Sequence, residues 1–349
     1  MSFPASSRFS YLFPAILTGL AILFILNISL GSVSIPPGQV IKALTGLGAD
    51  KTSWENIILQ FRVPKAITAV LVGSGLGISG LLMQTMFRNP LAGPFVLGIS
   101  SGASLGVALA ILSGMWLGVV LTQTGIAGSW IITFSAFAGA FLFLILVLVI
   151  SSKIRDSMSL LIIGLMMGSA TGALVSILQY YSKAESIQAY LIWTFGSLGG
   201  LTWNELWIFI PVTVAGMLGA WLLAKPLNAM LLGDLYAESM GMNIRKIRFR
   251  IILITSVLAG TVTAFCGPIA FIGIAVPHLT RLIFNTTNHR QLLPMVALTG
   301  GIIMLACDIV AQVPGREYTL PINAVTSILG APLVIWIVYK RHDLSSSFS

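Results

Sequence analysis

The sequence predicts an all-α, polytopic membrane protein, a single transmembrane domain over residues 1–349 with about ten membrane-spanning helices. Two observations support this prediction. Hydrophobic residues make up 56% of the chain and charged residues only 8%, whereas soluble domains contain about 25% charged residues. Apolar runs, counted at about 20 residues for each bilayer crossing, account for most of the chain. No low-complexity linker divides it, so we expect one domain.

Each expected helix is an apolar run bounded by charged, glycine or proline residues. The third run is short, at about 15 residues, and two later runs meet at Gly267-Pro268. Such broken segments are tolerated at membrane depth where protein surrounds them or they line a cavity. The expected helices are Tyr11–Leu30, Pro64–Met86, Gly98–Leu112, Ile126–Ile150, Leu160–Tyr181, Trp207–Ala224, Phe249–Phe265, Ile269–Phe284, Leu292–Gln312 and Asn323–Tyr339.

The first run, Tyr11–Leu30, could be mistaken for a secretory signal. It exceeds the 7–15 apolar residues of a signal peptide, so we expect a retained first span. Cys266 and Cys307 lie within or beside apolar runs and lack metal-ligand spacing, which favours reduced, structural cysteines. His278 and His289 likewise have no ligating partner at usable spacing, and no metal site is expected.

The second run is rich in glycine, which costs roughly 1 kcal/mol relative to alanine inside a helix. Gly73 and Gly77 form a GxxxG pair, the pattern that lets helix backbones approach closely in a bilayer. The run from Gly75 to Gly80 also satisfies GxGxxG, but dinucleotide binding needs a strand before that motif and a helix opening within it. We therefore expect helix packing here. The chain contains no Gly-Lys dipeptide and hence no P-loop, so any ATP would be hydrolysed by another subunit.

The charges predict the orientation in the membrane. The net charge of +9 comes from basic residues at the ends of apolar runs, which favours the positive-inside rule over nucleic-acid binding. With the N-terminus inside, both termini are cytoplasmic, and two long segments, Ser32–Arg62 and Ser182–Leu206, lie outside. The basic residues expected inside are Arg8, Arg88, Lys153, Arg155, Lys225, Arg245, Lys246, Arg248, Arg250, Arg281, Arg290, Lys340 and Arg341.

The stretch from Ser79 to Ala103 contains the words SGxxxQxxxRNPLAxPxxLGxxxGA. They resemble the FecCD family, the permease subunits of type II ABC importers for ferric siderophores, haem and vitamin B12, and the resemblance covers about residues 35–340. It implies a homodimer in the bacterial inner membrane, surrounded by lipid. It also implies two ATP-binding subunits that hold ATP and Mg, and a periplasmic or lipid-anchored substrate-binding protein. This chain itself would bind no cofactor.

Residues 226–243 lie between two spans on the expected cytoplasmic side and read as two short amphipathic helices. Gly233 is the joint, Asp234 can cap the second helix, and Gly241 can end it in the left-handed conformation. An ordinary interfacial loop is the alternative. The segment resembles the family's coupling helices, which implies docking on the ATPase. The implied coupling residues are Leu227, Asn228, Leu231, Leu232, Gly233, Leu235, Tyr236, Ala237 and Gly241.

On the outer face, Arg62-Val63-Pro64-Lys65 resembles the family's RxPR, which implies that two cations meet carboxylates of the substrate-binding protein. Interfacial anchoring by long basic side chains is the alternative. Lys65 replaces an arginine and loses its bidentate geometry. Gln312 stands where the family commonly has arginine, and Arg316, one turn later, is the candidate to replace it.

The words around Phe271–Arg281 and Asn288–Pro294 resemble the family's FIGLxxPHxxR and DHRxLLP. Histidine and arginine near helix carbonyls at a cytoplasmic helix end are the expected use of His278 and His289. Asn288 replaces the usual aspartate, so a hydrogen bond is expected where relatives have a salt bridge. Asp308 is the one acid within an expected span, and a functional role and a structural pairing both remain open.

No span carries a chain of charges such as an ion relay requires. The fifth and tenth spans instead present small or hydroxyl residues, which suit a bulky chelate that must be released. The resemblance implies that these spans, with two loops near the cytoplasmic end, line a passage at the dimer axis. The implied pathway residues are Asn89, Leu91, Ser157, Gly168, Thr171, Gly172, Thr326 and Ser327.

The expected function is therefore the permease subunit of an ATP-driven importer of a ferric siderophore or haem. A cobalamin importer of the same family is the alternative. An ion-coupled secondary transporter belongs to a different class, and only Asp308 could supply its coupling residue. A polytopic enzyme would need a catalytic cluster at one membrane face. None is visible, so no catalytic residue is assigned.

Overall fold

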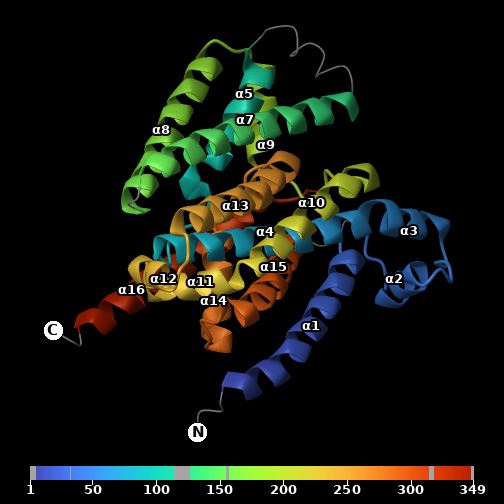
Figure 1. Cartoon of the computed structure of the whole chain (residues 1–349). Coiled ribbons are helices and arrows are strands. Elements are labelled where there is room, and N and C mark those ends of the chain that lie inside the picture. Colours follow the sequence, from blue (N-terminus) through green and yellow to red (C-terminus); the bar gives the residue numbers. More distant parts are fainter. Residues whose placement is uncertain (1–4, 32, 114–125, 155–156, 314–317, 347–349) are drawn as a thin grey trace.

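The computed structural model describes residues 5–31, 33–113, 126–154, 157–313 and 318–346, and every element within them is a helix (Figure 1). Seven of these helices are long and apolar enough to cross a membrane, and three shorter apolar helices bring the total to ten (7 + 3) among the described residues. Each expected span coincides with one of them. The ten are α1 Ala5–Ser29, α4 Val63–Phe87, α5 Ile99–Leu112, α7 Ile126–Lys153, α8 Ser157–Tyr180, α10 Trp203–Leu222, α13 Ile244–Cys266, α14 Ile272–Phe284, α15 His289–Ala311 and α16 Ile322–Ser346.

Shorter elements connect these helices. The expected outer segment 32–62 contains two helices and a π-helical turn. The expected outer segment 182–206 contains one short helix, after which the chain leads into α10. Two further helices occupy the expected coupling segment. These elements are α2 Pro37–Leu44, α3 Thr52–Asn56, η1 Ile57–Arg62, the 3₁₀ turn η2 Pro94–Leu97, α9 Ala184–Thr194, α11 Ala224–Leu232 and α12 Asp234–Ser239.

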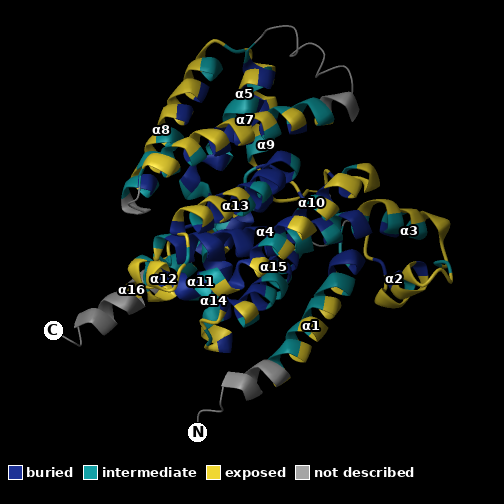
Figure 2. Cartoon of the chain, viewed as in Figure 1, coloured by how far each residue is buried: buried dark blue, intermediate teal, exposed yellow. Residues whose placement is uncertain are grey.

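Helix α4 is the centre of the molecule, and it packs against α15, α13, α14 and α10 (Figure 1). Within its most apolar stretch 83% of the residues are buried, compared with 17% in α1 and 22% in α8. Figure 2 shows the same contrast, with α4 dark blue and the outer helices largely yellow and teal. Since all three helices are apolar, the exposed faces of α1 and α8 suit lipid or another protein chain.

The glycines of α4 allow backbone contact, as the GxxxG pattern predicts. A Cβ atom added at Gly73 would lie 2.0 Å from the carbonyl oxygen of Gly300 in α15, and one added at Gly80 would lie 1.6 Å from that of Gly273 in α14. Contacts this short are never made by real Cβ atoms. Glycine at these positions therefore lets α4 lie directly against the backbones of two later helices.

Three of the differences between the observed and the expected helix bounds have a clear cause in the structure. The helical path into α4 begins at Thr52, because η1 continues directly into α4, with Pro64 as the second residue of α4. Helix α13 begins at Ile244, capped by the side chain of Asn243, so the basic cluster that follows lies within the helix. Helix α14 begins at Ile272, after a non-helical break that follows Cys266.

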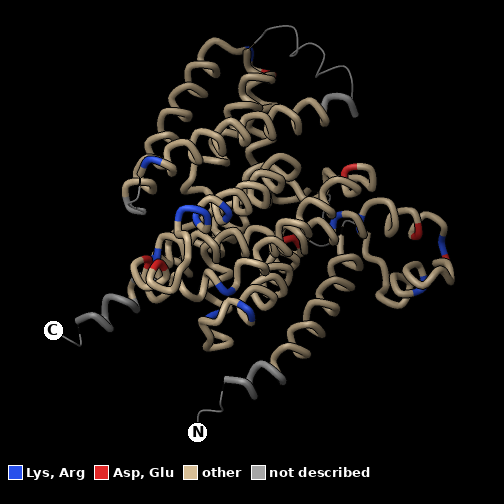
Figure 3. Tube along the Cα trace, viewed as in Figure 1, with Lys and Arg blue, Asp and Glu red and all other residues tan. Residues whose placement is uncertain are grey.

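The elongated fold places the expected functional segments at opposite ends. We call the end that carries α11 and α12 the coupling end, and the end that carries Arg62, Lys65, α2 and α3 the rim end (Figure 1). Helix α1 begins, and helix α16 finishes, toward the coupling end (Figure 1). In Figure 3 basic residues gather along α13 and α14 at that end, with the acids of α12 beside them, whereas acids and bases are interspersed around α2 and α3.

Candidate functional site

Helices α11 and α12 form the coupling segment, and they meet at Gly233, as expected. Gly233 has φ 122° and ψ 149°, a backbone conformation that residues other than glycine rarely adopt. Gly241, just after α12, is left-handed with φ 82°, as predicted. The prediction that Asp234 caps α12 is wrong, because Gly233 occupies the N-cap and Asp234 is the first helical residue. The Asp234 carboxylate instead pairs with two arginines.

The coupling segment presents apolar side chains outward. Leu232 is 66% exposed and Leu235 84% exposed, and Leu231 and Tyr236 are exposed beside them. Buried residues from the same two helices, Leu227 and Ala237 among them, anchor the segment to the rest of the protein. Apolar side chains that project from a firmly packed base are typical of a protein docking surface.

Helix α11 is attached to the membrane helices through Asn228. Its Oδ1 accepts the backbone N–H of His289 at 2.8 Å and lies 2.8 Å from the His289 ring Nδ1. The other ring nitrogen, Nε2, lies 2.8 Å from the hydroxyl of Thr85 in the last turn of α4. Asn228 also donates from Nδ2 to Asn288, the residue that caps α15, at 2.9 Å. The hydrogen bond expected at Asn288 is therefore present.

Helix α12 is attached through Asp234, whose two carboxylate oxygens have different partners. Oδ1 accepts from Arg88 at 3.2 Å, and Oδ2 accepts from Arg248 of α13. Arg88 is the left-handed C-cap of α4, with φ 47°. The next residue, Asn89, accepts the N–H of Leu91 through its side chain. One carboxylate thus connects α12, the end of α4 and α13, immediately before the loop of expected pathway residues.

One of the two histidines, His289, differs from its expected use. His289 is the first residue of α15, not a residue near helix carbonyls, and it is buried. Arg281 does lie in the last turn of α14, and its guanidinium donates to the side chain of Gln84 in α4 at 2.7 Å. No group of three metal-ligating side chains occurs among the residues that were placed. Both cysteines are buried free thiols, as expected.

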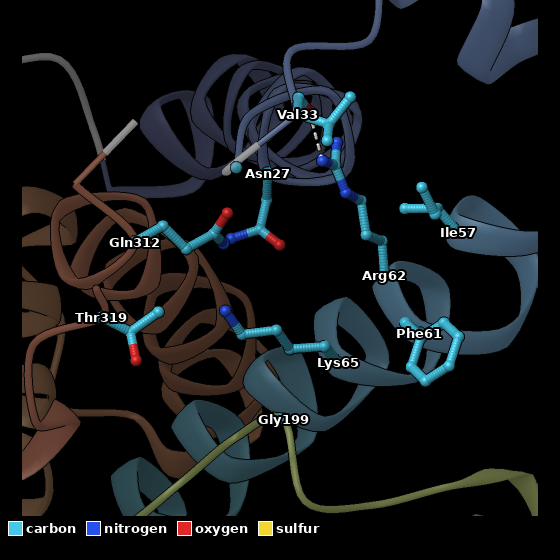
Figure 4. A pocket seen from close by; sticks show the side chains of 10 residues that line it. Asn27, Val33, Ile57, Phe61, Arg62, Lys65, Gly199, Gln312 and Thr319 are labelled. Atoms are coloured by element: carbon cyan, nitrogen blue, oxygen red, sulfur yellow. Dashed lines mark hydrogen bonds between the residues drawn. The ribbon is translucent and has the colours of Figure 1, made fainter. Parts of the chain in front are cut away.

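At the rim end, Arg62 is engaged by the backbone. Its guanidinium donates to the carbonyl oxygens of Ile28 at 2.7 Å and Ser29 at 2.9 Å, and to that of Val33. These carbonyls lie at and just beyond the end of α1, where helical partners are lacking. Figure 4 shows the Arg62 side chain reaching toward Val33 across a pocket of about 440 Å³.

Lys65, on the floor of the same pocket, pairs with the acid of α15. Its ammonium lies 3.0 Å from Asp308 Oδ1, and the Asp308 carboxylate is 3% exposed. The other oxygen, Oδ2, accepts from Asn27 of α1 at 2.9 Å and from Gln312 at 2.6 Å. Figure 4 shows the side chains of Asn27, Lys65 and Gln312 converging. Asp308 therefore has a structural pairing, one of the two roles that the sequence left open.

These contacts bear on the expected docking residues without testing their role. Arg62 and Lys65 are already paired within the chain, and only 22% of the Lys65 side chain is exposed. Gln312 supplies a hydrogen bond to Asp308 where relatives carry an arginine. Arg316 lies outside the described residues. Docking of a substrate-binding protein at this rim stays a prediction.

The expected pathway residues fall into three groups. In the first group, Gly172 on α8 faces open space and Ser327 on α16 is half-buried. In the second group, Thr171 is 4% exposed and Thr326 is 1% exposed. The hydroxyls of both threonines donate to carbonyl oxygens of their own helices. The other members are described by position: Gly168 faces Ser101 of α5, Asn89 and Leu91 lie in the loop after α4, and Ser157 begins α8. Thr171 and Thr326 thus contribute to packing in this conformation. A role for the others in a passage stays a prediction.

Three polar contributors were not assigned from the sequence. Asn27 is a lone amide within an apolar span, a signal that could have identified it. Arg248 was placed on the expected cytoplasmic side without a partner, and Thr85 was not singled out. The partners of Asn27 and Thr85, Asp308 and His289, are 281 and 204 residues away in sequence, whereas Asp234 is 14 residues from Arg248.

A polytopic helical chain with a docking segment at one end and a polar rim at the other is the arrangement of a transport permease. Known proteins agree. The sequence profile of the FecCD transport family matches residues 19–340. The haemin transport system permease protein HmuU of Yersinia pestis is 32% identical over 95% of this chain and 98% of its own length. The vitamin B12 import system permease protein BtuC of Serratia proteamaculans is 33% identical over 93% of this chain and 92% of its own.

A solved structure is similar over the same extent. It is described as an inward-facing conformation of a metal-chelate type ABC transporter, and it has a TM-score of 0.80 and 29% identity, covering 93% of this chain and 98% of its own. The chain belongs to the FecCD transport family and is a permease of a type II ABC importer.

Proposed function

We propose that this chain is the membrane-spanning subunit of an ATP-driven importer, present as two copies in the bacterial inner membrane with both termini in the cytoplasm. Two separate ATPase subunits dock on α11 and α12, and a substrate-binding protein delivers its cargo at the rim end. The loop Asn89–Leu91 and the start of α8 approach the dimer axis and close the passage on the cytoplasmic side.

One observation carries this proposal: four apolar side chains are exposed on the coupling segment, above a base that is buried in the permease. Leu235 alone is 84% exposed. The apolar cluster lies on two short helices that connect α10 to α13, with charged residues beside it (Figures 1 and 3). This position favours a protein partner over lipid. A cleft on a cytoplasmic partner would bury it.

The proposed cargo is a ferric siderophore or haem. HmuU is named for haemin, and the solved relative is described as a metal-chelate type transporter. Cobalamin is the runner-up, because BtuC relatives reach 33% identity over nearly the whole chain. The residues that touch cargo are not identified by these similarities, so the choice rests on transport measurements with ferric siderophore, haem and cobalamin as alternative substrates.

Leu235→Asp tests the docking surface. The substitution removes the free energy gained by burying the leucine and places an unpaired carboxylate in an apolar contact. We therefore expect the affinity for the ATPase to fall by at least about tenfold. The measurement is co-purification of ATPase with permease, followed by substrate-stimulated ATP hydrolysis and uptake in reconstituted vesicles. Leu232→Asp should behave similarly. Leu47→Asp, at an exposed leucine near α2 at the rim end, is the matched control for ATPase co-purification and should leave it unchanged. Normal uptake with Leu235→Asp would contradict the assignment.

A further inference from the structure

The last turn of α4 is held by the coupling segment at two points. Thr85 is reached from α11 through His289 and Asn228, and Arg88 is reached from α12 through Asp234. The two points are three residues apart, one in the last turn of α4 and the other in the left-handed cap that follows it. Each of the two coupling helices therefore has its own polar attachment to the same end of α4.

The two attachments differ in burial. His289 is 1% exposed, and its ring and backbone are both bonded to Asn228. Breaking that attachment would leave buried polar groups without partners, which is costly. The side chains of the Arg88–Asp234 pair are 48% and 33% exposed. Water can solvate both charges when they separate, so this second contact can open and reform at little cost.

The joint between the attachments is Gly233. Its φ of 122° places α12 at an angle to α11 that a residue with a side chain would rarely permit. Helix α11 is thus fixed at the base, and α12 is a short lever beyond a glycine hinge. Leu235 and Tyr236, the exposed docking residues of α12, lie directly after Asp234 on that lever.

Arg88 connects the lever to the loop that follows α4. As the left-handed cap it sets the direction in which the chain leaves the helix, and the N–H of Asn89 bonds back to Gln84 within the same cap. Asn89 then fixes Leu91 through its side chain, and the N–H of Ala92 bonds to the Asn89 carbonyl. A pull on the Arg88 guanidinium therefore acts on the first residue of a turn that is hydrogen-bonded as a unit.

We propose that the Asp234–Arg88 ion pair transmits movement of α12 to the Asn89–Leu91 loop, while Asn228 and His289 hold α11 in place as the pivot. The inference rests on the proposed docking of an ATPase at α12. Arg248 keeps the second oxygen of the carboxylate oriented, so that Oδ1 stays directed at Arg88. Asp234 and Arg88 are positioning residues, and neither needs to touch substrate or nucleotide.

The test is a double-mutant cycle on the reconstituted complex with ATPase and binding protein. Leu91→Cys is introduced with Cys266→Ala and Cys307→Ala, and oxidative cross-linking between the two copies is measured with and without ATP. We expect ATP to change the cross-linking yield in this background. Asp234→Asn and Arg88→Ala should each reduce that response roughly fivefold or more, and the double variant should lose no more than either single one.

Controls separate transmission from docking and from folding. Glu238→Gln removes the same charge from the same helix and should leave the response unchanged, whereas Arg88→Lys, which keeps a cation at the contact, should restore part of it. In every variant, the amount of ATPase that co-purifies should equal the amount that co-purifies with the Leu91→Cys background protein. A full ATP response in Arg88→Ala, or loss of ATPase binding in Asp234→Asn, would overturn the inference. If the background complex itself binds no ATPase, the proposed function fails first.

Discussion

Two aspartates at opposite ends of the molecule are paired with basic residues in different ways. Asp308 at the rim end is 3% exposed and bonded to three side chains from three helices, Lys65, Asn27 and Gln312. Asp234 at the coupling end is 33% exposed and held by Arg88 and Arg248. The first ion pair is enclosed by α1, α4 and α15, and the second lies at the surface of a hinged segment.

The difference separates fixed from movable contacts. A buried carboxylate with a full set of partners is costly to break, because an unpaired charge would remain in the protein interior. A surface pair contributes little to stability and can be exchanged for water. We therefore expect the rim end to keep its geometry during transport and the coupling end to rearrange, and three predictions test this contrast.

The largest expected effect concerns which end faces the cytoplasm. A single cysteine in place of exposed Glu238 on α12 should react with an impermeant thiol reagent only after the membrane is opened, because the basic residues around α12 place it inside. A cysteine in place of exposed Glu185 on α9 should react from outside. Labelling of intact and permeabilised cells, in a background without Cys266 and Cys307, measures this.

The outcome is all-or-none at each position. If the short helix α5 were not a complete crossing, every later loop would change sides. Glu238→Cys would then label in intact cells. That result would exclude docking of a cytoplasmic ATPase at α12 and remove the contrast between the two ends.

The second prediction is that Asp308→Asn lowers the free energy of unfolding by about 3 kcal/mol, at the low end of the range for a broken buried ion pair. We expect a value at the low end of that range because 22% of the Lys65 side chain is exposed, so water can partly solvate its ammonium group. Chemical denaturation in detergent micelles measures it. Asp50→Asn, which removes the exposed partner of Lys42, is the control and should leave the free energy of unfolding unchanged.

A compensating variant sharpens this prediction. If the cost of Asp308→Asn comes from the unpaired Lys65 ammonium, then combining it with Lys65→Met should recover part of the lost stability. An equal or larger loss in the double variant would show that the carboxylate acts mainly through Asn27 and Gln312.

The smallest expected effect is that of Asp234→Asn on stability, a decrease below about 1 kcal/mol, as for other partly exposed pairs. The same variant should have its large effect on the ATP response of the loop after α4, so stability and coupling are affected separately. Unfolding in micelles under the conditions used for Asp308→Asn gives a direct comparison. A loss as large as that of Asp308→Asn would show that Asp234 belongs to the fixed framework instead.

Much of this architecture could be predicted from sequence because the signals are local. Apolar runs identified the ten apolar helices among the described residues, since a chain segment in lipid must satisfy its own backbone hydrogen bonds by forming a helix. Gly73 and Gly80 indicated close packing because glycine is otherwise unfavourable in a helix. Gly233 and Gly241 marked the bounds of α12, because positive φ angles favour glycine.

The pairings could not be predicted in the same way. Arg88 and Asp234 are 146 residues apart in sequence, and Asn27 and Asp308 are 281 apart. Such contacts depend on how the helices pack, which no local pattern encodes. The same limit explains Thr171 and Thr326, since a hydroxyl in an apolar helix has the same local signature whether its face is buried or lines a passage. Arg62 was singled out at the start of α4, but its three carbonyl partners depend on the path of the chain after α1.

The glycine face of α4 also has a consequence for how the chain is made. Ser74, on the turn between Gly73 and Gly77, bonds the carbonyl of Ala297, which is 223 residues further along the chain. During synthesis α4 therefore enters the bilayer long before the helices that cover it exist. Lipid must therefore contact the glycine face of α4 until α13, α14 and α15 are inserted and replace the lipid there. The helix is long and apolar enough to cross a membrane by itself, which it must do before the helices that finally surround it have been made.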